Sequence, residues 1–581
     1  MPESGVSGPT TLAPRKRLQE VEMPDTHEVF NQVPPLVDYD AAADPALLEG
    51  LRREGAADSE TEVRELGRIV GSARVQEWTR LASEHPPTLR THDRFGNRTD
   101  EVEYHPAWHE LMDCAVRHGL HGSPWSESKP NAHVLRAAKY IVWATQSEQG
   151  SCCPITMTYS AVPALRREPE LAERFEPLLT SEEYDFGLRP PESKRGLIAG
   201  MAMTEKQGGS DVRANTTRAE PSDDGTYRLT GHKWFCSAPM SDLFLVLAQA
   251  PGGLTCFLLP RVLPDGERNP LRLQRLKDKL GNRSNASSEV EYDGAVAWRV
   301  GEEGRGVRTI VEMVNFTRFD CVIGATGGMR WGVHQAVHHA AHREVFGKRL
   351  IEQPLMRNVL ADLALEAEAA TTLVLRLAGA IDRSLAGDDG ESAFRRISGA
   401  VSKYWVTKRW PQHAAEALEC LGGNGYVEES GLPRLYREAP LQSIWEGSGN
   451  VAALDVLRAM KKEPETVEAF FDELDAASGA DRRLDKAIRE LRRDLSEPDG
   501  IEARARIVVE RMALALQGSL LVRHGAPAVA EAFCTSRLNG EWGHAFGTLP
   551  AGLDLATVLE RARPTLPKNT NTVREEVGRA R

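Results

Sequence analysis

The sequence has no hydrophobic run long enough to cross a membrane. None of its apolar stretches reaches the roughly 18 residues that a spanning helix needs, and its first thirty residues lack the apolar core of a signal peptide. Its eight cysteines form no CxxC pair and no spacing typical of a disulfide framework. We therefore expect a cytoplasmic protein with reduced thiols and no membrane segment.

Positive charge is scarce relative to negative charge. The 72 Lys and Arg residues face 84 Asp and Glu residues, which gives a net charge of −12. This balance argues against nucleic-acid binding through bulk charge, although it allows a local basic patch. No GxGxxG motif follows a predicted strand, so a Rossmann-type dinucleotide site is not expected.

A metal site is not expected either. His334, His338 and His342 recur at four-residue steps with His339 beside them, but neither an HExxH motif nor a carboxylate-rich partner stands nearby. These histidines are better explained as residues of a helix surface or a subunit interface.

The 581 residues, 41% hydrophobic and 27% charged, describe an ordinary globular chain with room for three or four domains. Helical spacing dominates the first part, short β-rich runs follow, with a hairpin over residues 243–259, and helical patterns then return. We predict an α+β multidomain fold: a disordered tail (1–25), an N-terminal helical domain (26–180), a middle β-barrel or sandwich (181–303), a C-terminal helical bundle (304–462), and an extra C-terminal helical segment with a flexible tail (463–581).

The stretch SIWEGSGN, residues 443–450, carries the strongest chemical signal. It places the Glu446 carboxylate beside the Trp445 indole and follows it with glycines. Contact with an aromatic surface removes water from a carboxylate and raises its pKa towards a value useful for a base. The glycines let backbone approach a planar ligand. Taken alone, the stretch is more typical of a glycine-rich loop before a helix, with Glu446 as a first-turn acid.

Other motifs make the chain resemble a known enzyme family. LGGNGY (421–426) and LYRE (435–438) precede the Trp-Glu-Gly loop, and MTEKQGGSD (203–211) lies far upstream. Together they resemble the signatures of the acyl-CoA dehydrogenase flavoproteins, with Lys206 where the family usually has proline. LKDKLGNRSNAS (276–287) is typical of the AidB-like branch, which is associated with the response to DNA alkylation. The resemblance covers nearly the whole chain and implies the acyl-CoA dehydrogenase-like fold.

The resemblance implies an FAD site between the β-domain and the second helical domain, completed by a neighbouring subunit. Phe235 is expected to stack on the flavin, Ser237 to bond near its N5, and Arg343 to meet the pyrophosphate of the adjacent subunit's FAD. The residues implied to contact the cofactor are Met201, Met203, Thr204, Gly209, Ser210, Phe235, Cys236, Ser237, Arg343, Phe346, Gln353, Gly422, Gly423, Trp445, Gly447, Ser448 and Asn450.

Glu446 matches the family's catalytic base. This match implies α,β-dehydrogenation of an acyl-CoA thioester, in which Glu446 removes the α-proton and flavin N5 accepts the β-hydride. Arg318 matches an arginine near the active site, although an ion pair between helices or subunits explains it equally well. The implied partners are a short or branched acyl-CoA, an electron-transfer flavoprotein and further copies of the chain in a homotetramer.

The AidB-like branch offers an alternative of a different class, a flavoprotein that binds double-stranded DNA and keeps only vestigial dehydrogenase activity. Oxidase chemistry with oxygen is a lesser third possibility. The basic residues that could serve DNA binding are Arg458, Arg482, Lys486, Arg489, Arg493, Arg504, Arg511 and Arg523. Acidic residues interleave with them, so a solvated helix laced with salt bridges is the competing interpretation.

Overall fold

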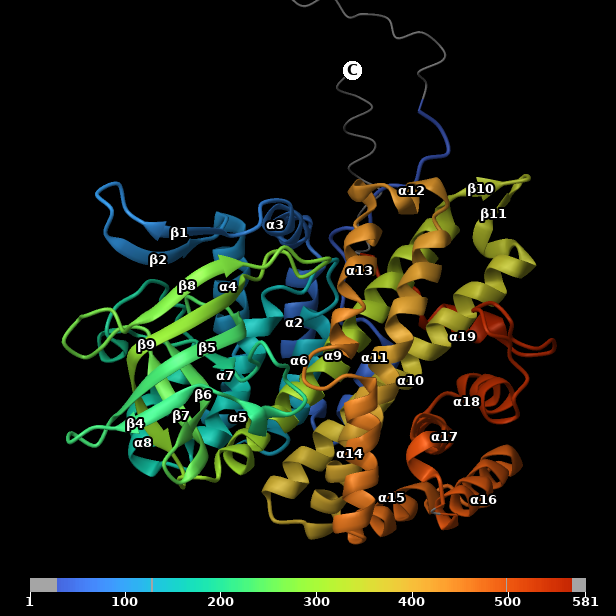
Figure 1. Ribbon diagram of the computed structural model, residues 1–581. Coiled ribbons are helices and arrows are strands. Elements are labelled where there is room, and N and C mark those ends of the chain that lie inside the picture. The colour runs from blue at the N-terminus through green and yellow to red at the C-terminus, as the bar shows by residue number, and fades with distance from the viewer. Residues whose placement is uncertain (1–28, 127–128, 498, 567–581) are drawn as a thin grey trace, which may run out of the picture.

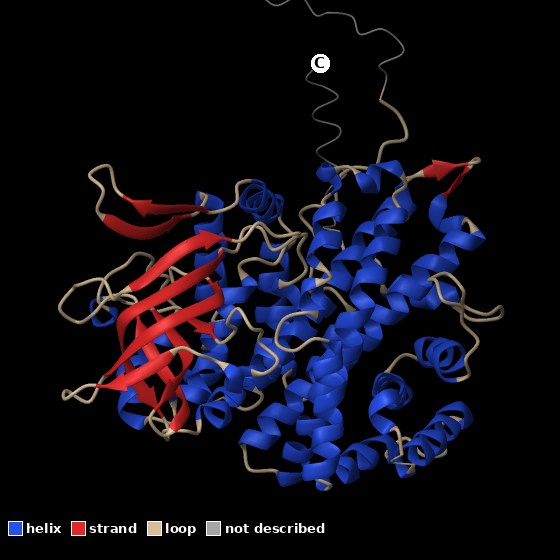
Figure 2. Cartoon of the chain, in the orientation of Figure 1, coloured by secondary structure: helices blue, strands red, loops and turns tan. Residues whose placement is uncertain are grey.

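The computed structural model of the chain describes residues 29–126, 129–497 and 499–566. The predicted tail over residues 1–25 lies outside the described residues. Most strands gather on one side of the molecule and the long helices on the other, where a small hairpin over residues 344–349 also lies (Figures 1 and 2). No helix within the described ranges is both long and apolar enough to cross a membrane.

The N-terminal part is mostly helical, because apolar residues recur on one face of each helix. Its helices are α1 (Pro45–Arg53), α2 (Glu60–Val70), α3 (Ala73–Glu84), α4 (Pro106–Arg117), α5 (Ser123–Ser126), α6 (Ala132–Trp143), α7 (Cys152–Leu165) and α8 (Pro169–Leu179). An antiparallel hairpin of β1 (Thr88–His92) and β2 (Arg98–Glu103) interrupts them. The sequence did not predict this hairpin, whose strands are rich in charged residues.

The middle part is a barrel. Its strands are β3 (Ala199–Ala202), β4 (Arg218–Pro221), β5 (Tyr227–Ser237), β6 (Leu243–Ala250), β7 (Gly253–Pro260), β8 (Leu271–Leu276) and β9 (Ser287–Val300). Pairing runs β6–β4–β5–β9–β7 and returns to β6, which closes the sheet on itself. The predicted hairpin is confirmed by the antiparallel pairing of β6 with β7, in which Ala250 faces Gly253.

The C-terminal bundle is built from α9 (Gly306–His342), α10 (Pro354–Leu385), α11 (Asp389–Glu419), α12 (Gly423–Tyr426), α13 (Leu432–Glu438) and α14 (Gly449–Lys462). A small hairpin of β10 (Glu344–Val345) and β11 (Lys348–Arg349) follows α9 at the upper corner of the bundle (Figure 1). The turn over residues 386–388, which contains Gly387, separates α10, which ends at Leu385, from α11, which begins at Asp389.

The extra segment adds α15 (Glu465–Asp475), α16 (Arg482–Ser496), α17 (Ile501–His524), α18 (Pro527–Phe533) and α19 (Leu555–Arg561). It shares one hydrophobic core with the bundle, to which α17 contributes Leu516 and Leu520. Arg561 of α19 also pairs with Glu49 of α1 and Glu368 of α10, both at 2.7 Å. The segment is therefore packed onto the rest of the chain.

Candidate active site

The loop between α13 and α14 holds Glu446 in an uncommon backbone conformation. Its φ is +55°, in the left-handed region that residues with a Cβ rarely adopt, and Gly447 follows at +105°. A conformation of this kind costs about 1–3 kcal/mol and persists only where the surroundings enforce it. Such strain is typical of a functional loop rather than of an ordinary helix start.

The Glu446 carboxylate has one close partner. The Thr317 hydroxyl of α9 donates to its Oε2 at 2.6 Å. Burial raises the pKa of Glu446, while the Thr317 hydrogen bond and the charges of Arg318 and Lys403 act in the opposite direction. The outcome is a raised pKa, which suits a general base.

Two neighbours, Arg318 and Lys403, fix the backbone of this loop. Arg318 donates through Nε to the Glu446 carbonyl at 2.8 Å and pairs with Asp455 of α14 at 2.8 Å. Lys403 of α11, buried beneath the loop, donates to the carbonyls of Gln442 at 2.7 Å and Gly447 at 3.2 Å. Arg318 therefore combines the two roles considered from the sequence, an ion pair between helices and a contact with the loop that carries the candidate base.

The MTEKQGGSD segment follows the end of β3 and is anchored by a buried ion pair. Glu205 and Lys233 are both fully buried, with a separation of 2.8 Å. Burial alone would raise the pKa of Glu205, but hydrogen bonds from Lys233 and from the backbone of Thr216 and Thr217 lower it to about 2. Residue spacing offers no signal for this pair, because its members lie on separate segments and only the fold brings them together.

The same segment presents an open polar edge. The hydroxyls of Thr204 and Ser210 have no hydrogen-bond partner within the described residues, and both side chains are accessible. A Cβ at Gly209 would lie 2.4 Å from the Thr204 Oγ1, so glycine lets the backbone pass close to this hydroxyl without displacing it. These groups fit the polar edge of a bound planar cofactor.

The end of β5 lies beside that edge. A β-bulge between Lys233 and Cys236 lets both of these residues point into the barrel, whereas Phe235 stays 47% exposed. The Cys236 side chain, expected to contact the cofactor, is fully buried in the barrel core. That expectation is wrong for the thiol, because the bulge turns it inward.

Packing brings the two distant motifs together. Trp445 packs against the same hydrophobic cluster as Met201 and Met203. The indole also donates to Gln442 at 2.9 Å, and Gln442 donates in turn to Gln149 of the N-terminal part at 3.1 Å. Trp445 thus contacts the hydrophobic cluster that Met201 and Met203 also contact, while Gly447 and Ser448 follow it in the loop and Asn450 lies in the first turn of α14.

The remaining predicted cofactor residues lie elsewhere. Arg343, Phe346 and Gln353 follow the far end of α9, and Gly422 and Gly423 adjoin α12 at the same end of the bundle (Figure 1). Twenty-six residues of helix separate Thr317 from Arg343, which corresponds to roughly 40 Å at about 1.5 Å per residue. A single chain therefore does not bring these residues to Glu446.

The three histidines at helical spacing are individually accounted for. His334 is buried, His338 contacts the Pro34 carbonyl through Nε2 at 2.9 Å, and His342 contacts the His338 carbonyl at 2.8 Å. Within the described ranges, no group of three or more His, Cys, Asp or Glu residues is arranged to hold a metal ion.

The basic residues predicted for DNA binding divide into two sets. Four of them form a stripe on the exposed face of α16, and no ion pair or hydrogen bond of their side chains occurs among the described residues: Arg482, Lys486, Arg489 and Arg493. We call these four residues the α16 stripe. Arg458 lies 3.8 Å from Asp455, while Arg504 donates to the carbonyls of Glu497 and Asp499 and Arg511 pairs with Asp494.

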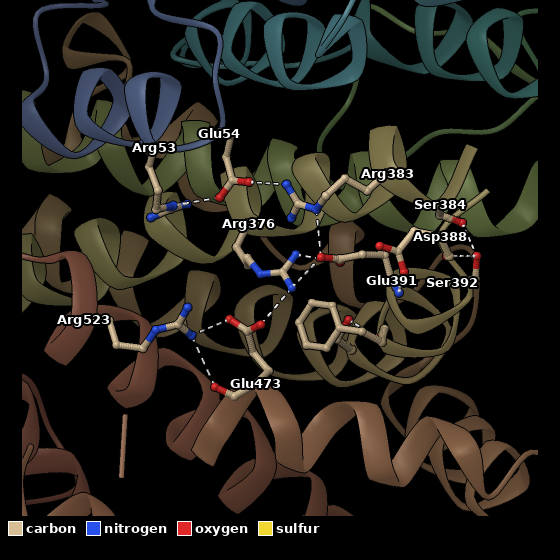
Figure 3. A network of polar contacts seen from close by, with 12 residues as sticks. Arg53, Glu54, Arg376, Arg383, Ser384, Asp388, Glu391, Ser392, Glu473 and Arg523 are labelled. Carbon is tan, nitrogen blue, oxygen red and sulfur yellow. Dashed lines mark hydrogen bonds and ion pairs between the residues drawn. The ribbon is translucent and has the colours of Figure 1, made fainter. Parts of the chain in front are cut away.

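Arg523 has a partner within the chain. It pairs with Glu473 at 2.8 Å inside a network that also contains Arg376 and Glu391 (Figure 3). Because Glu473 is shared between Arg376 and Arg523, it balances part of the Arg523 charge. This pairing disfavours a contact of Arg523 with DNA, whose assignment stays a prediction; the partner lies far away in the chain, on α15, and was not visible from spacing.

Comparison with known proteins agrees with this geometry. Residues 31–186 match the adaptive response protein AidB N-terminal domain, residues 200–295 the acyl-CoA dehydrogenase middle domain and residues 304–461 the acyl-CoA dehydrogenase C-terminal domain. The chain is 46% identical over 521 residues to the putative acyl-CoA dehydrogenase AidB of Escherichia coli strain K12, covering 89% of this chain and 95% of that one.

Two further similarities come from Caenorhabditis elegans. Acyl-CoA dehydrogenase family member 11 is 30% identical over 528 residues, with 87% of this chain and 84% of that protein covered. The crystal structure of ACDH-11 in complex with C11-CoA superposes with a TM-score of 0.80 at 27% identity and covers 98% of both chains. The chain thus belongs to the acyl-CoA dehydrogenase family of FAD-dependent oxidoreductases, in the group that carries an AidB N-terminal domain.

Proposed function

We propose that the protein binds FAD and dehydrogenates an acyl-CoA thioester, with Glu446 as the base. The observation that carries this proposal is the Glu446 carboxylate, whose pKa is raised by burial and which Thr317 holds on a left-handed backbone, in a loop whose Trp445 packs against the same hydrophobic cluster as Met201 and Met203. The similarity to a structure solved in complex with C11-CoA supports an acyl-CoA substrate.

The accessible hydroxyls of Thr204 and Ser210, the close turn at Gly209 and the exposed Phe235 ring fit an isoalloxazine ring and its polar edge. Bound there, FAD supplies the acceptor for the hydride that leaves the β-carbon. Arg343, Phe346, Gln353, Gly422 and Gly423 would serve the FAD of a second copy, because they lie at the opposite end of α9 from Thr317.

The chain's own groups account for the proton step. Glu446 accepts the α-proton, and its raised pKa makes that transfer more favourable. The backbone N–H of Glu446 has no acceptor among the described residues, so it is free to bind the thioester oxygen as negative charge develops there. Arg318 and Lys403 hold the carbonyls of Glu446 and Gly447, which directly follow this N–H, and so restrain the backbone that carries it.

The test is product formation. Purified protein loaded with FAD would be incubated with a panel of acyl-CoA thioesters and an artificial electron acceptor, and the loss of two hydrogens would be followed by mass spectrometry. We expect a product with wild type and with the surface control Glu468→Gln, and none with Glu446→Gln. Equal product from Glu446→Gln would remove Glu446 from the role of base.

Oligomerisation is part of this proposal. Phe346 (95% exposed), Leu355 (83%) and Tyr426 (82%) leave apolar surface at the end of the bundle that carries Arg343. A second copy covering this end would bury that surface and bring the two halves of the site together, as a homotetramer requires. An electron-transfer flavoprotein as acceptor and a cytoplasmic location remain predictions.

We also propose, as a second candidate, that the protein binds double-stranded DNA in the alkylation response. The α16 stripe favours this role, because its four cations have no partner among the described residues. Neutralising all four should flatten the dependence of log affinity on log salt by about 0.9 for each phosphate that the protein no longer neutralises. An unchanged salt dependence would contradict binding through this face.

A further inference from the structure

The loop over residues 277–287, between β8 and β9, is held from one side by two buried carboxylates. Glu438 of α13 accepts from both the backbone N–H and the side-chain amide of Asn282, each at 2.7 Å. Glu148 accepts from the Ser284 hydroxyl at 2.6 Å and its N–H at 3.0 Å. Both carboxylates are nearly inaccessible, so the loop is docked against the helices.

Two glycines show how close this docking is. A Cβ at Gly281 would lie 2.3 Å from the Arg437 carbonyl oxygen, and a Cβ at Gly150 would lie 1.9 Å from the Ser284 Oγ. The backbone at Gly281 therefore contacts the backbone at Arg437, next to Glu438, and the backbone at Gly150 contacts the Ser284 hydroxyl, near Glu148. The loop is fixed precisely enough to position a side chain on its opposite face.

That side chain is Lys279. Its neighbours Asp278 and Leu280 point into solvent, whereas the Lys279 ammonium points inward and donates to the Asn285 carbonyl at 2.5 Å and to the Ser287 Oγ at 3.0 Å. The Ser287 hydroxyl in turn lies 3.1 Å from the Ser237 hydroxyl. An ammonium group is thus joined through two hydroxyls to the end of β5.

The Lys279 charge favours one direction of this chain of hydrogen bonds. An ammonium group has donors only, so Lys279 occupies one lone pair of Ser287, and either Ser287 or Ser237 can be the donor between the two hydroxyls. The positive charge favours the arrangement in which the Ser287 hydrogen points away from Lys279 to the Ser237 oxygen, which leaves the Ser237 hydrogen available to the site. Because donors in such a chain polarise one another, the charge makes Ser237 a stronger donor towards the site.

Lys279 lies on the side of the barrel that faces Glu446. The thiol of Cys153, at the start of α7, is close to Asn285 and Ser237, and the charges of Lys279 and Glu446 both act on it. A cation on this side would stabilise the electron-rich, reduced form of any redox-active ring bound beside Phe235 and Ser237. Burial and the Glu148 charge raise the pKa of Glu438, which lessens the negative charge that the two carboxyl groups place beside Lys279.

We propose that Lys279 is a positioning residue for the bound flavin. Glu438 and Glu148 hold the loop that carries Lys279, and Lys279 orients the Ser237 hydroxyl as a donor and stabilises the reduced, electron-rich ring. This inference rests on the proposed FAD site but not on the identity of the substrate. It assigns a task to the LKDKLGNRSNAS motif, to which the proton and hydride steps give no role.

The test measures the midpoint potential of the bound FAD by equilibration with a redox dye, together with the affinity of the flavin for sulfite. Lys279→Met removes the charge while keeping a side chain of similar length. Loss of a charge-assisted hydrogen bond should shift the reduced-to-oxidised ratio about tenfold towards the oxidised form. For a two-electron couple this corresponds to a potential lower by about 30 mV, with weaker sulfite binding.

Two further variants separate this role from a structural one. Ser287→Ala cuts the hydrogen-bond chain but leaves the charge, and should lower the potential by a smaller amount. Arg283→Gln removes an exposed charge from the same loop and should leave the potential unchanged, because solvent screens it. FAD affinity and the unfolding temperature of each variant would be recorded alongside.

An unchanged potential in Lys279→Met with FAD bound would overturn the inference. If Lys279→Met fails to bind FAD, Ser287→Ala decides, and an unchanged potential there would overturn it equally. Absence of acyl-CoA dehydrogenation by wild type would refute the proposed reaction without touching this inference, because the potential is measured without substrate. Failure of wild type to bind FAD would refute both.

Discussion

Replacing Thr317 with valine tests how the candidate base is tuned. Valine has nearly the same shape as threonine but cannot donate the 2.6 Å hydrogen bond to the Glu446 Oε2. A hydrogen bond to a charged group contributes about 1.5–3 kcal/mol, and about 1.4 kcal/mol corresponds to one pKa unit. Because the bond stabilises the carboxylate, its loss should raise the pKa of Glu446 further, by about 1–2 units.

The assay is the pH dependence of kcat/KM, whose acidic limb reports protonation of the base in the free enzyme. The limb should move to higher pH in Thr317→Val and stay in place in Thr317→Ser, which keeps the hydroxyl. Thr326→Val is the matched control, because Thr326 lies buried on the same helix and donates to the Val322 carbonyl rather than to Glu446. An acidic limb that stays in place or moves to lower pH in Thr317→Val would refute the reasoning.

Three further outcomes are expected. Glu205→Gln leaves Lys233 charged and fully buried, so the free energy of unfolding in urea should fall by about 3–5 kcal/mol at neutral pH. Because the folded pKa of Glu205 is depressed to about 2, its contribution is present above the unfolded pKa near 4.5 and is lost as pH falls towards 2, so the difference from wild type should shrink in acid. Gly447→Ala places a Cβ at φ +105° and 3.1 Å from Val451, which should lower kcat with little loss of stability in calorimetry. Arg523→Gln should lower the unfolding temperature, since Glu473 loses a partner, while leaving affinity for duplex DNA unchanged; weaker DNA binding would contradict the assignment of Arg523 to the internal network.

The order of helical, β and helical parts was predictable, because apolar spacing changes from helical to strand-like near residue 196 and back near residue 304. The hairpin of β6 and β7 was predictable from two apolar runs around a Pro-Gly-Gly turn. The hairpin of β1 and β2 was not, since Arg98, Asp100, Glu101 and Glu103 give β2 no apolar face to recognise.

The site was predictable only where a motif carries it. Glu446 and the segment over residues 201–210 stand out in the sequence, whereas Thr317 and Lys403 reach Glu446 and its loop from helices that lie far upstream in the chain. Cys236 was misplaced because a bulge changes which residues of β5 face the core, and bulges leave no reliable trace in spacing.

The central claim is that Glu446 removes a proton from an acyl-CoA thioester beside a bound flavin. The most direct measurement is anaerobic stopped-flow bleaching of the flavin absorption band on mixing with acyl-CoA thioesters, comparing wild type with Glu446→Gln. The account predicts rapid bleaching of wild type by at least one thioester and a rate lower by about 10²- to 10⁴-fold in the variant. A flavin that stays oxidised in wild type with every thioester, or that bleaches equally fast in Glu446→Gln, would contradict it.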